Sequence, residues 1–196
     1  PIIAIGGGVL LDIIGLAASL YRRGVPYIKV PTTLLAIVDA SVGVKTAINH
    51  FSRRNRLGSY YPPVAAYLDR SFLQTLEEKE FVSAMGEIIK IAVIKSKDLF
   101  LILEQNIEKI MKEKFLIGDT ALKIISIAID DMIEELEPNL WEKNLKRLVD
   151  FGHSFSPLIE MNSIEDSSVR SLMHGEAVAI DVVFSCCLAV HKKIMK

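Results

Sequence analysis

Three residues in this sequence have the side chains that could together hold a metal ion. Glu87 is a lone carboxylate in the apolar segment 84–94, His153 lies in the segment 150–157, and His174 opens the last long apolar stretch. A zinc-type ion with an open coordination position needs only three protein ligands, and these side chains offer two imidazole nitrogens and one carboxylate oxygen. Because they are widely spaced, the metal site exists only if the fold brings them together.

Each of these residues also has a simpler interpretation. Glu87 could form an ordinary ion pair with Lys90, one helical turn later, or it could bind the metal while Lys90 faces a substrate. A lone histidine such as His153 is more often a hydrogen-bonded core residue than a ligand. His174 differs because it stands at an expected helix start, where Glu176 could accept a hydrogen bond from its imidazole and support metal binding.

A glycine turn near the N-terminus suggests a phosphate site. Residues 6–8 are all glycine, between an expected strand and a helix that carries Asp12. Such a turn lets backbone N–H groups approach a phosphate at the helix N-terminus. The triplet lacks the GxGxxG spacing, so a plain tight turn explains it equally well by itself. Together with Thr32 and Thr33 at the next strand end, it favours a site for a nucleotide pyrophosphate.

Several polar residues lie in expected loops or at the ends of expected elements. Arginine and lysine from separate parts of a chain can converge on a phosphate, arginine as a bidentate donor and lysine as a point charge. A solvated basic loop is the preferred interpretation for Arg22, Arg53 and Arg56, but it explains Lys45 less well. The candidates for substrate binding are Arg23, Asp39, Lys45, Asn49, Arg54 and Asn55.

The first 76 residues predict an α/β structure. Segment 2–5 is expected to be a buried central strand, 9–22 a helix and 27–30 a second strand, which together form a Rossmann-like βαβ unit with a parallel pair. Ligands gather at the carboxyl ends of such strands. The remaining elements expected in this part are a short helix at 34–42, an extended segment at 46–49, a loop at 50–58 and a strand at 64–68.

Strand signals end near Leu76, and the remainder of the chain is expected to be helical. The predicted helices are 78–95, 98–111, 117–135, 141–151, 154–161 and 175–193, with a polar surface loop at 162–170. The predicted organisation is therefore a nucleotide-binding α/β part in residues 1–76, followed by an all-α part in residues 77–196 that carries the candidate metal ligands.

Composition argues against a nucleic acid or a membrane as partner. With 23 Lys and Arg against 24 Asp and Glu, no net field favours a polyanion, and no continuous apolar run reaches the roughly 18 residues of a membrane span. Cys186 and Cys187 are interpreted as buried side chains in a reducing compartment, and no signal peptide is visible, so we expect a cytoplasmic protein. An N-terminal strand without an upstream partner leads us to expect part of a larger protein.

Taken in order, the motifs of the chain resemble those of the sugar phosphate cyclases, the family that includes dehydroquinate synthase. The resemblance is carried by segments 6–12, 21–25, 30–35, 38–50, 86–90, 151–153 and 174–177. It implies a dehydroquinate synthase-like fold and a homodimeric enzyme that uses NAD and Zn²⁺ or Co²⁺. Such enzymes transiently oxidise a hydroxyl of a sugar phosphate, eliminate phosphate, reduce the carbon again and close a carbocycle by intramolecular aldol addition.

The resemblance also implies a role for each candidate residue, with Arg23 acting either in its own subunit or in a neighbouring one. The implied roles are metal ligation by Glu87, His153 and His174, catalysis by Asp39, Lys45, Asn55 and Lys90, substrate or phosphate binding by Arg23, Arg54, Lys146 and Asp150, and NAD binding by Gly7, Gly8, Asp12, Thr32 and Thr33.

Departures from the dehydroquinate synthase pattern narrow the substrate. Asp150 replaces an asparagine, Pro157 a second histidine and Val44 a glycine, and Met132 falls where a basic residue helps to hold the substrate carboxylate. A pocket that loses cationic groups and gains a carboxylate suits a neutral polyol. The pattern resembles the sedoheptulose 7-phosphate cyclases and, through segment 138–142 as well, the group that forms 2-epi-5-epi-valiolone.

Other activities stay open. Dehydroquinate synthase and desmethyl-4-deoxygadusol synthase are alternatives within the family, the second usually with a small residue in place of Asp150. A metal-dependent polyol dehydrogenase of the glycerol dehydrogenase type shares the architecture. A catalytically inactive binding protein derived from a cyclase would keep the same motifs.

Overall fold

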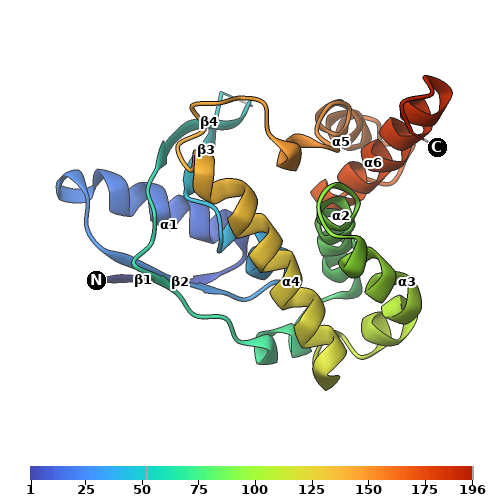
Figure 1. Cartoon of the computed structure of the whole chain (residues 1–196). Coiled ribbons are helices and arrows are strands. Elements are labelled where there is room, and N and C mark those ends of the chain that lie inside the picture. The colour runs from blue at the N-terminus through green and yellow to red at the C-terminus, as the bar shows by residue number, and fades with distance from the viewer. Residues whose placement is uncertain (52, 196) are drawn as a thin grey trace.

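The computed structural model describes residues 1–51 and 53–195, with the backbone alone for Arg53 and Arg54. An α/β part comes first along the chain, in blue and cyan in Figure 1, and is followed by helices in green to red. This is the predicted order of a parallel α/β part and an all-α part. The predicted boundary between residues 76 and 77 falls in the short link just before the first long helix of the second part.

The N-terminal part is built on the predicted βαβ unit. Its elements are β1 (Ile2–Gly6), α1 (Gly8–Leu20), the short turn η1 (Tyr21–Arg23), β2 (Tyr27–Pro31) and β5 (Ala65–Ala66). The strands are parallel, in the order β1-β2-β5. Gly6 lies opposite Pro31 in the register, and the Thr32 amide donates to the Gly6 carbonyl at 3.0 Å. The carboxyl ends of β1 and β2 are therefore side by side.

β1, predicted as a buried central strand, has one buried and one exposed face among the described residues. It is the edge of the described sheet, where Ala4 is buried but Ile3 and Ile5 are 58% and 55% exposed. Successive side chains of a strand point to opposite faces. Ala4 packs with Leu11 and Ala18 of α1, whereas the two isoleucines face the other way.

Residues 50–58 were predicted to be a loop, and that prediction is wrong. β3 (Lys45–His50) and β4 (Arg53–Tyr60) form an antiparallel hairpin, with Thr46 opposite Ser59. A Cβ on Gly58 would lie 2.5 Å from the Thr46 carbonyl oxygen, so glycine permits the close approach of the strands. Most of this ribbon is exposed and polar, and its cross-strand backbone bonds leave no mark in composition.

Helices follow where apolar periodicity predicts them, with one exception. The elements are η3 (Arg70–Thr75), α2 (Glu78–Ile94), α3 (Lys97–Lys112), α4 (Gly118–Leu136), α5 (Ser156–Glu165) and α6 (His174–His191). Ser96 caps α3 by accepting a hydrogen bond from the Leu99 amide at 3.2 Å. Because α5 continues to Glu165, the polar loop expected from residue 162 begins later.

The exception is the segment from residue 137 to residue 151, called the connecting segment below. It contains only the short turns η4 (Glu137–Asn139) and η5 (Leu148–Asp150) where a helix at 141–151 was predicted. The Asn139 side chain donates to the Asn144 carbonyl at 2.6 Å and accepts from the Asn144 amide at 3.0 Å. Asparagine side chains here satisfy backbone groups that a helix would have paired, which explains the error.

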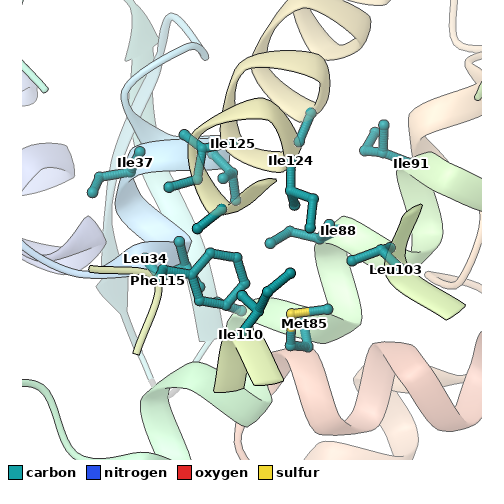
Figure 2. Close-up of a cluster of buried hydrophobic side chains, with 14 of the residues drawn as sticks. Leu34, Ile37, Met85, Ile88, Ile91, Leu103, Ile110, Phe115, Ile124 and Ile125 are labelled. Carbon is teal, nitrogen blue, oxygen red and sulfur yellow. The ribbon is translucent and has the colours of Figure 1, made fainter. Parts of the chain in front are cut away.

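The largest core lies among the helices and continues into the α/β part (Figure 2). Ile88 and Ile91 of α2 pack with Ile124 of α4 and with Phe115, all nearly inaccessible to solvent. Leu34 from the α/β part belongs to the same cluster, at 0% exposure. The α/β part and the helical part therefore share one hydrophobic core, which holds them together.

Among the described residues, α6 is the one helix long and apolar enough by composition to span a membrane. Its first half is nevertheless packed inside the protein. Val178 and Val182 are buried, and the fully buried Asp181 accepts hydrogen bonds from the first amides of α5, Phe155 N at 2.5 Å and Ser156 N at 2.8 Å. Further along α6, the cysteine pair was predicted to be buried, but Cys186 is only partly buried and Cys187 is exposed in the described structure.

Candidate metal centre and substrate pocket

Helices α2 and α6 touch through their backbones at a pair of glycines. A Cβ on Gly86 would lie 1.9 Å from the Gly175 carbonyl oxygen, and a Cβ on Gly175 would lie 1.7 Å from the Ser83 carbonyl oxygen. Only glycine fits at either position. Because Glu87 follows Gly86 and His174 precedes Gly175, this contact brings the two side chains together from positions far apart in the sequence.

The three predicted metal ligands converge, and we call them the metal cluster. Glu87 Oε1 lies 3.4 Å from Nε2 of His174 and 3.8 Å from Nε2 of His153. The ligand atoms of the three residues all lie within 4.8 Å of one another. One carboxylate oxygen and two imidazole nitrogens around a common point are a ligand set that zinc accepts while keeping a position open. The residues fit the implied metal.

Each histidine is oriented by a hydrogen bond at its other ring nitrogen. His153 Nδ1 lies 3.3 Å from the Phe151 carbonyl oxygen, and His174 Nδ1 lies 3.2 Å from Oε2 of Glu160. Partners of this kind set the tautomer, so that Nε2 presents its lone pair to a metal. The prediction that Glu176 supports His174 is wrong, because Glu176 accepts from the Met173 amide at 2.9 Å at the start of α6.

The geometry of Glu87 fits both interpretations. Its Oε1 faces the histidines, while Oε2 lies 2.5 Å from Nζ of Lys90, and both side chains are almost fully buried. Burial would raise the pKa of Glu87, but the hydrogen bond from His174 and the charges of Lys90 and His153 outweigh it and lower the pKa to about 2. The carboxylate is therefore ionised, as a metal ligand must be.

A pocket of about 650 Å³ opens next to the metal cluster. Met132 lines it, at the position where the dehydroquinate synthase pattern has a basic residue. Tyr60 and Glu142 line it as well. The residues predicted to act in the site that line this pocket are Asp12, Asp39, Lys45, Asn55, Lys90 and Asp150, together with the metal cluster.

Other predicted residues lie elsewhere. Arg23 is exposed on the turn after α1 and does not line the pocket of its own chain. Lys146, predicted to bind substrate or phosphate, is exposed and does not line the pocket of the described residues. The neighbouring Arg147 instead contacts Glu142 and Asp150, which line the pocket. The backbone is extended at Arg147, so adjacent side chains point in different directions. Arg54 lies on β4, and its side chain is outside the described residues.

The predicted nucleotide residues gather at the carboxyl ends of β1 and β2. Gly7 caps the N-terminus of α1, and a Cβ added there would lie 3.2 Å from Cγ2 of Thr33. Thr33 Oγ1 accepts a hydrogen bond from the Ala36 amide at 3.1 Å. Asp12, one turn into α1, reaches the pocket. Helix α1 thus leads from the glycine turn, beside Thr33, to the pocket. This is the arrangement expected where the carboxyl ends of parallel strands bind a nucleotide.

Lys29 is a buried residue of the site that the sequence analysis missed. Its Nζ donates to the carbonyls of Ala40 and Gly43 at 2.7 and 2.8 Å, and the side chain is fully buried. One of these carbonyls belongs to the last residue of the π-helical turn η2 (Ala36–Ala40), which carries Asp39 into the pocket, and the other belongs to the loop after it. Burial lowers the pKa of Lys29 to about 8. The sequence signal that could have revealed Lys29 was a lysine within an otherwise apolar strand.

Four residues form a charged corner beside the pocket: Lys45, Glu142 and Asp150, which line it, and Arg147, which contacts two of them. Arg147 donates to both carboxylate oxygens of Asp150, from Nε at 2.8 Å and from Nη2 at 2.6 Å. Glu142 pairs with Arg147 and with Lys45 Nζ, the latter at 2.9 Å. Pro157, which was used beside Asp150 to choose the substrate, is exposed at the start of α5 and does not line the pocket.

Comparison with known families covers the whole chain. Residues 1–83 match the model of the 3-dehydroquinate synthase N-terminal region, and residues 84–196 match that of the C-terminal region. The chain spans about half the length of the curated relatives that it matches.

Individual relatives agree with the family match. A 2-epi-5-epi-valiolone synthase from Actinomyces sp is 50% identical over 96% of this chain and 50% of the relative. A 3-dehydroquinate synthase from Thermodesulfovibrio yellowstonii is 39% identical, over 96% of this chain and 50% of the relative. The solved structure of ValA, a 2-epi-5-epi-valiolone synthase from Streptomyces hygroscopicus subsp. jinggangensis 5008 with NAD⁺ and Zn²⁺ bound, is 45% identical with a TM-score of 0.92, covering 100% of this chain and 53% of ValA. The chain therefore belongs to the dehydroquinate synthase-like family of sugar phosphate cyclases.

Proposed function

We propose that this chain provides the active-site pocket of an NAD- and zinc-dependent sedoheptulose 7-phosphate cyclase that forms a valiolone-type cyclitol. The observation that carries the proposal is one pocket that combines the metal cluster with Lys90, Asp39 and an Asp150 carboxylate held by Arg147. The relatives named as 2-epi-5-epi-valiolone synthases support the substrate, and the NAD⁺ and Zn²⁺ of ValA support the cofactors.

The chemistry divides between the cofactors and the side chains. When bound, zinc on Glu87, His153 and His174 would acidify a sugar hydroxyl, and NAD near Gly7 and Thr33 would store a hydride and return it. The transient ketone acidifies the neighbouring C–H bond, so phosphate can leave, with the leaving phosphate itself as the base. After the carbon is reduced again, the same pocket holds the open chain for aldol ring closure.

The protein side chains orient the sugar and stabilise developing charge. Lys90 and Lys45 are cationic donors for oxyanions that form during oxidation and ring closure. Burial and the nearby Glu87 raise the pKa of Asp39, so its carboxyl can hold a proton beside the substrate. Asn55 lines the same pocket and can donate its amide to a hydroxyl or to the phosphate.

The pocket wall supports a substrate without a carboxylate. Met132 is buried in the wall and offers no charge or donor, and Asp150 would repel an anion at its side of the pocket. A neutral polyol chain can instead donate its hydroxyls to Asp150. We therefore assign sedoheptulose 7-phosphate in preference to the carboxylated sugar phosphate that 3-dehydroquinate synthases cyclise.

The test uses the full-length protein with NAD and Zn²⁺ and offers each of the two sugar phosphates separately. We expect phosphate release and a cyclised product from sedoheptulose 7-phosphate, with no net NADH. His153→Gln should abolish phosphate release, whereas His191→Gln, on the exposed end of α6, should leave it unchanged.

Each contrary outcome identifies a different function. Turnover of the carboxylated substrate alone would establish a dehydroquinate synthase. NADH produced in proportion to the substrate consumed would establish a polyol dehydrogenase. Absence of bound zinc with all three ligands intact would point to a binding protein without catalysis.

We also propose that the enzyme is a homodimer in which Arg23 reaches the phosphate of the neighbouring subunit. Its exposure, away from its own pocket, is what supports this idea. Mixing an Arg23→Ala protein with a His153→Gln protein should restore phosphate release, because one site of each mixed dimer is then complete. A mixture that stays inactive while mixed dimers form would contradict the proposal.

A further inference from the structure

Lys29 is a fully buried cation that the chemistry proposed above does not use. It lies on β2, the middle strand of the sheet, on the strand face that also buries Tyr27 and Pro31. It is not among the residues that line the pocket. Removing a charged side chain from water is costly unless polar partners replace the water. The partners of its ammonium group therefore indicate what the residue does.

These partners are two backbone carbonyls of one turn. The Lys29 Nζ donates to the Ala40 carbonyl at 2.7 Å and to the Gly43 carbonyl at 2.8 Å. Ala40 is the last residue of η2, and the last carbonyls of a helix have no partner within the helix. A lysine side chain can satisfy such carbonyls. Lys29 thus binds residues 40–43, called the clamped turn below, to a strand that is paired on both sides.

The clamped turn lies between two residues of the pocket. Asp39 directly precedes it, Lys45 begins β3 just after it, and both line the pocket. The amides of Val42 and Gly43 donate to the Asp39 carbonyl at 3.0 and 3.1 Å. Those bonds fix the shape of the turn, but they do not fix its place relative to the sheet. The contact with Lys29 does so, because its backbone belongs to β2.

The charge of Lys29 strengthens this contact. Burial lowers its pKa to about 8, while the charges of Asp12 and Asp39 act in the opposite direction and favour the protonated form. The ammonium is therefore largely protonated at neutral pH. Hydrogen bonds from a charged donor are roughly twice as strong as those between neutral groups.

We propose that Lys29 is a positioning residue, which fixes the clamped turn to β2 and thereby sets the places of Asp39 and Lys45 in the pocket. It acts through these two residues and does not itself touch the substrate. Such placement matters because a shift of about 1 Å in a reacting group can lower a rate on the order of 100-fold. For its catalytic consequence, this inference rests on the function proposed above.

The first experiment measures the turn without any reaction. Lys29→Met keeps a similar length and removes the charge and the donors. Lys114→Met is the matched control, because the half-buried Lys114 also donates to a backbone carbonyl, that of Leu76 at 3.1 Å, but does not line the pocket. We would follow amide hydrogen exchange of the full-length proteins by mass spectrometry, in the clamped turn and in α4.

In Lys29→Met, we expect the amides of Val42 and Gly43 to exchange at least about tenfold faster, the effect of losing roughly one hydrogen bond from a charged donor. The amides of α4 should change much less, and Lys114→Met should leave the turn unchanged. An unchanged turn in Lys29→Met, or equal acceleration in the turn and in α4, would overturn the proposal.

Two further variants keep the exchange test decisive. Lys29→Arg retains the charge and the donors and should return the turn towards slow exchange, so exchange as fast as in Lys29→Met would count against the proposal. If Lys29→Met does not fold, Lys29→Gln, which is shorter and neutral, should show the same local acceleration. Its absence there would also overturn the proposal.

A kinetic comparison separates positioning from a purely structural role. With sedoheptulose 7-phosphate, Lys29→Met should lower kcat by about 10–100-fold with a smaller change in KM, and Lys29→Arg should recover most of the loss. Zinc content should stay complete, because the metal cluster lies on other elements. Lys114→Met should keep the unmodified kcat.

An unchanged kcat in Lys29→Met, despite faster exchange of the turn, would show a purely structural role and overturn the proposal. If the unmodified protein turns over neither sugar phosphate, the proposed function fails. The exchange measurement then still decides whether Lys29 fixes the clamped turn.

Discussion

The metal cluster and the charged corner line the same pocket but are held by different forces. The metal cluster depends on a backbone contact between α2 and α6 at Gly86 and Gly175, with Glu87 almost fully buried. The charged corner depends on ion pairs of partly exposed side chains, and Lys45 is 60% exposed. Packing tolerates almost no change of shape, whereas exposed ion pairs respond to salt and pH. The two regions should therefore fail under different perturbations.

The largest effect should come from adding a methyl group at the helix contact. Gly175→Ala places a Cβ 1.7 Å from the Ser83 carbonyl oxygen, so α2 and α6 must move apart. We expect loss of zinc binding and destabilisation at or above the upper end of the roughly 1–3 kcal/mol typical of overpacking. Denaturant unfolding and zinc titration measure the two effects.

Gly118→Ala is the matched control for this substitution. No atom lies within 4 Å of the added Cβ, but the backbone φ of +80° remains unfavourable for alanine. The free energy of unfolding of this variant should fall by about 1–2 kcal/mol through backbone strain, and its zinc affinity should be unchanged. Equal loss of zinc affinity in both variants would mean that the helix contact does not position the cluster.

Glu87→Gln should break the metal cluster with little change of shape. The substitution removes a charged ligand and leaves Lys90 buried without its ion-pair partner. We expect stoichiometric zinc binding to be lost and stability to fall by about 3–5 kcal/mol in the zinc-free protein. Metal analysis after gel filtration and urea unfolding provide the measurements, and retained zinc would refute the assignment of Glu87 as a ligand.

Glu160→Gln should have an intermediate effect, because Glu160 acts through His174. It weakens the hydrogen bond at His174 Nδ1 and leaves all three ligands in place. We expect zinc affinity to fall by about 10–100-fold. Glu165→Gln, an exposed position on the same helix, should leave the affinity unchanged. Competition with a chromogenic chelator measures the difference, and identical values for the two variants would remove Glu160 from the site.

The smallest effect should be a release of the charged corner in acid while Glu87 stays ionised. The pKa of Glu142 is lowered below its ordinary 4.5, so its ion pairs contribute stability above pH 4.5 and lose it as the pH falls through the folded-state value. Glu87, with a pKa of about 2, remains ionised longer.

The fluorescence of Trp141, the single tryptophan of the chain and the residue before Glu142, measures this release during an acid titration. It should change before far-UV circular dichroism does, and 1 M salt should weaken the same contact. The stability involved is at most about 1 kcal/mol, as for other partly exposed pairs. Glu142→Gln should lack the early fluorescence change, whereas Glu137→Gln should keep it. A single transition for both probes would show that the two regions are not independent.

Much of the fold and of the site could be predicted because the signals are local. The apolar periodicity of α2, α3, α4 and α6 specified these helices to within a few residues. Glycines next to Glu87 and His174 marked the cluster in the family motif, and their reason became visible only in the helix contact. The hairpin at β3 and β4 and the connecting segment were missed, because exposed strands and asparagine-capped turns lack an apolar pattern.

Sequence alone determined the chemical groups: one carboxylate and two imidazoles for a metal, lysines and aspartates for a polyol, and a glycine turn for a nucleotide. Tertiary structure decided which groups support them. Glu160 supports His174 because α5 packs against the start of α6, whereas Glu176 pairs locally with the Met173 amide. The connecting segment likewise brings Glu142 to Lys45 of β3 and Tyr60 of β4. Local patterns report what each residue can do, but long-range packing selects its partner.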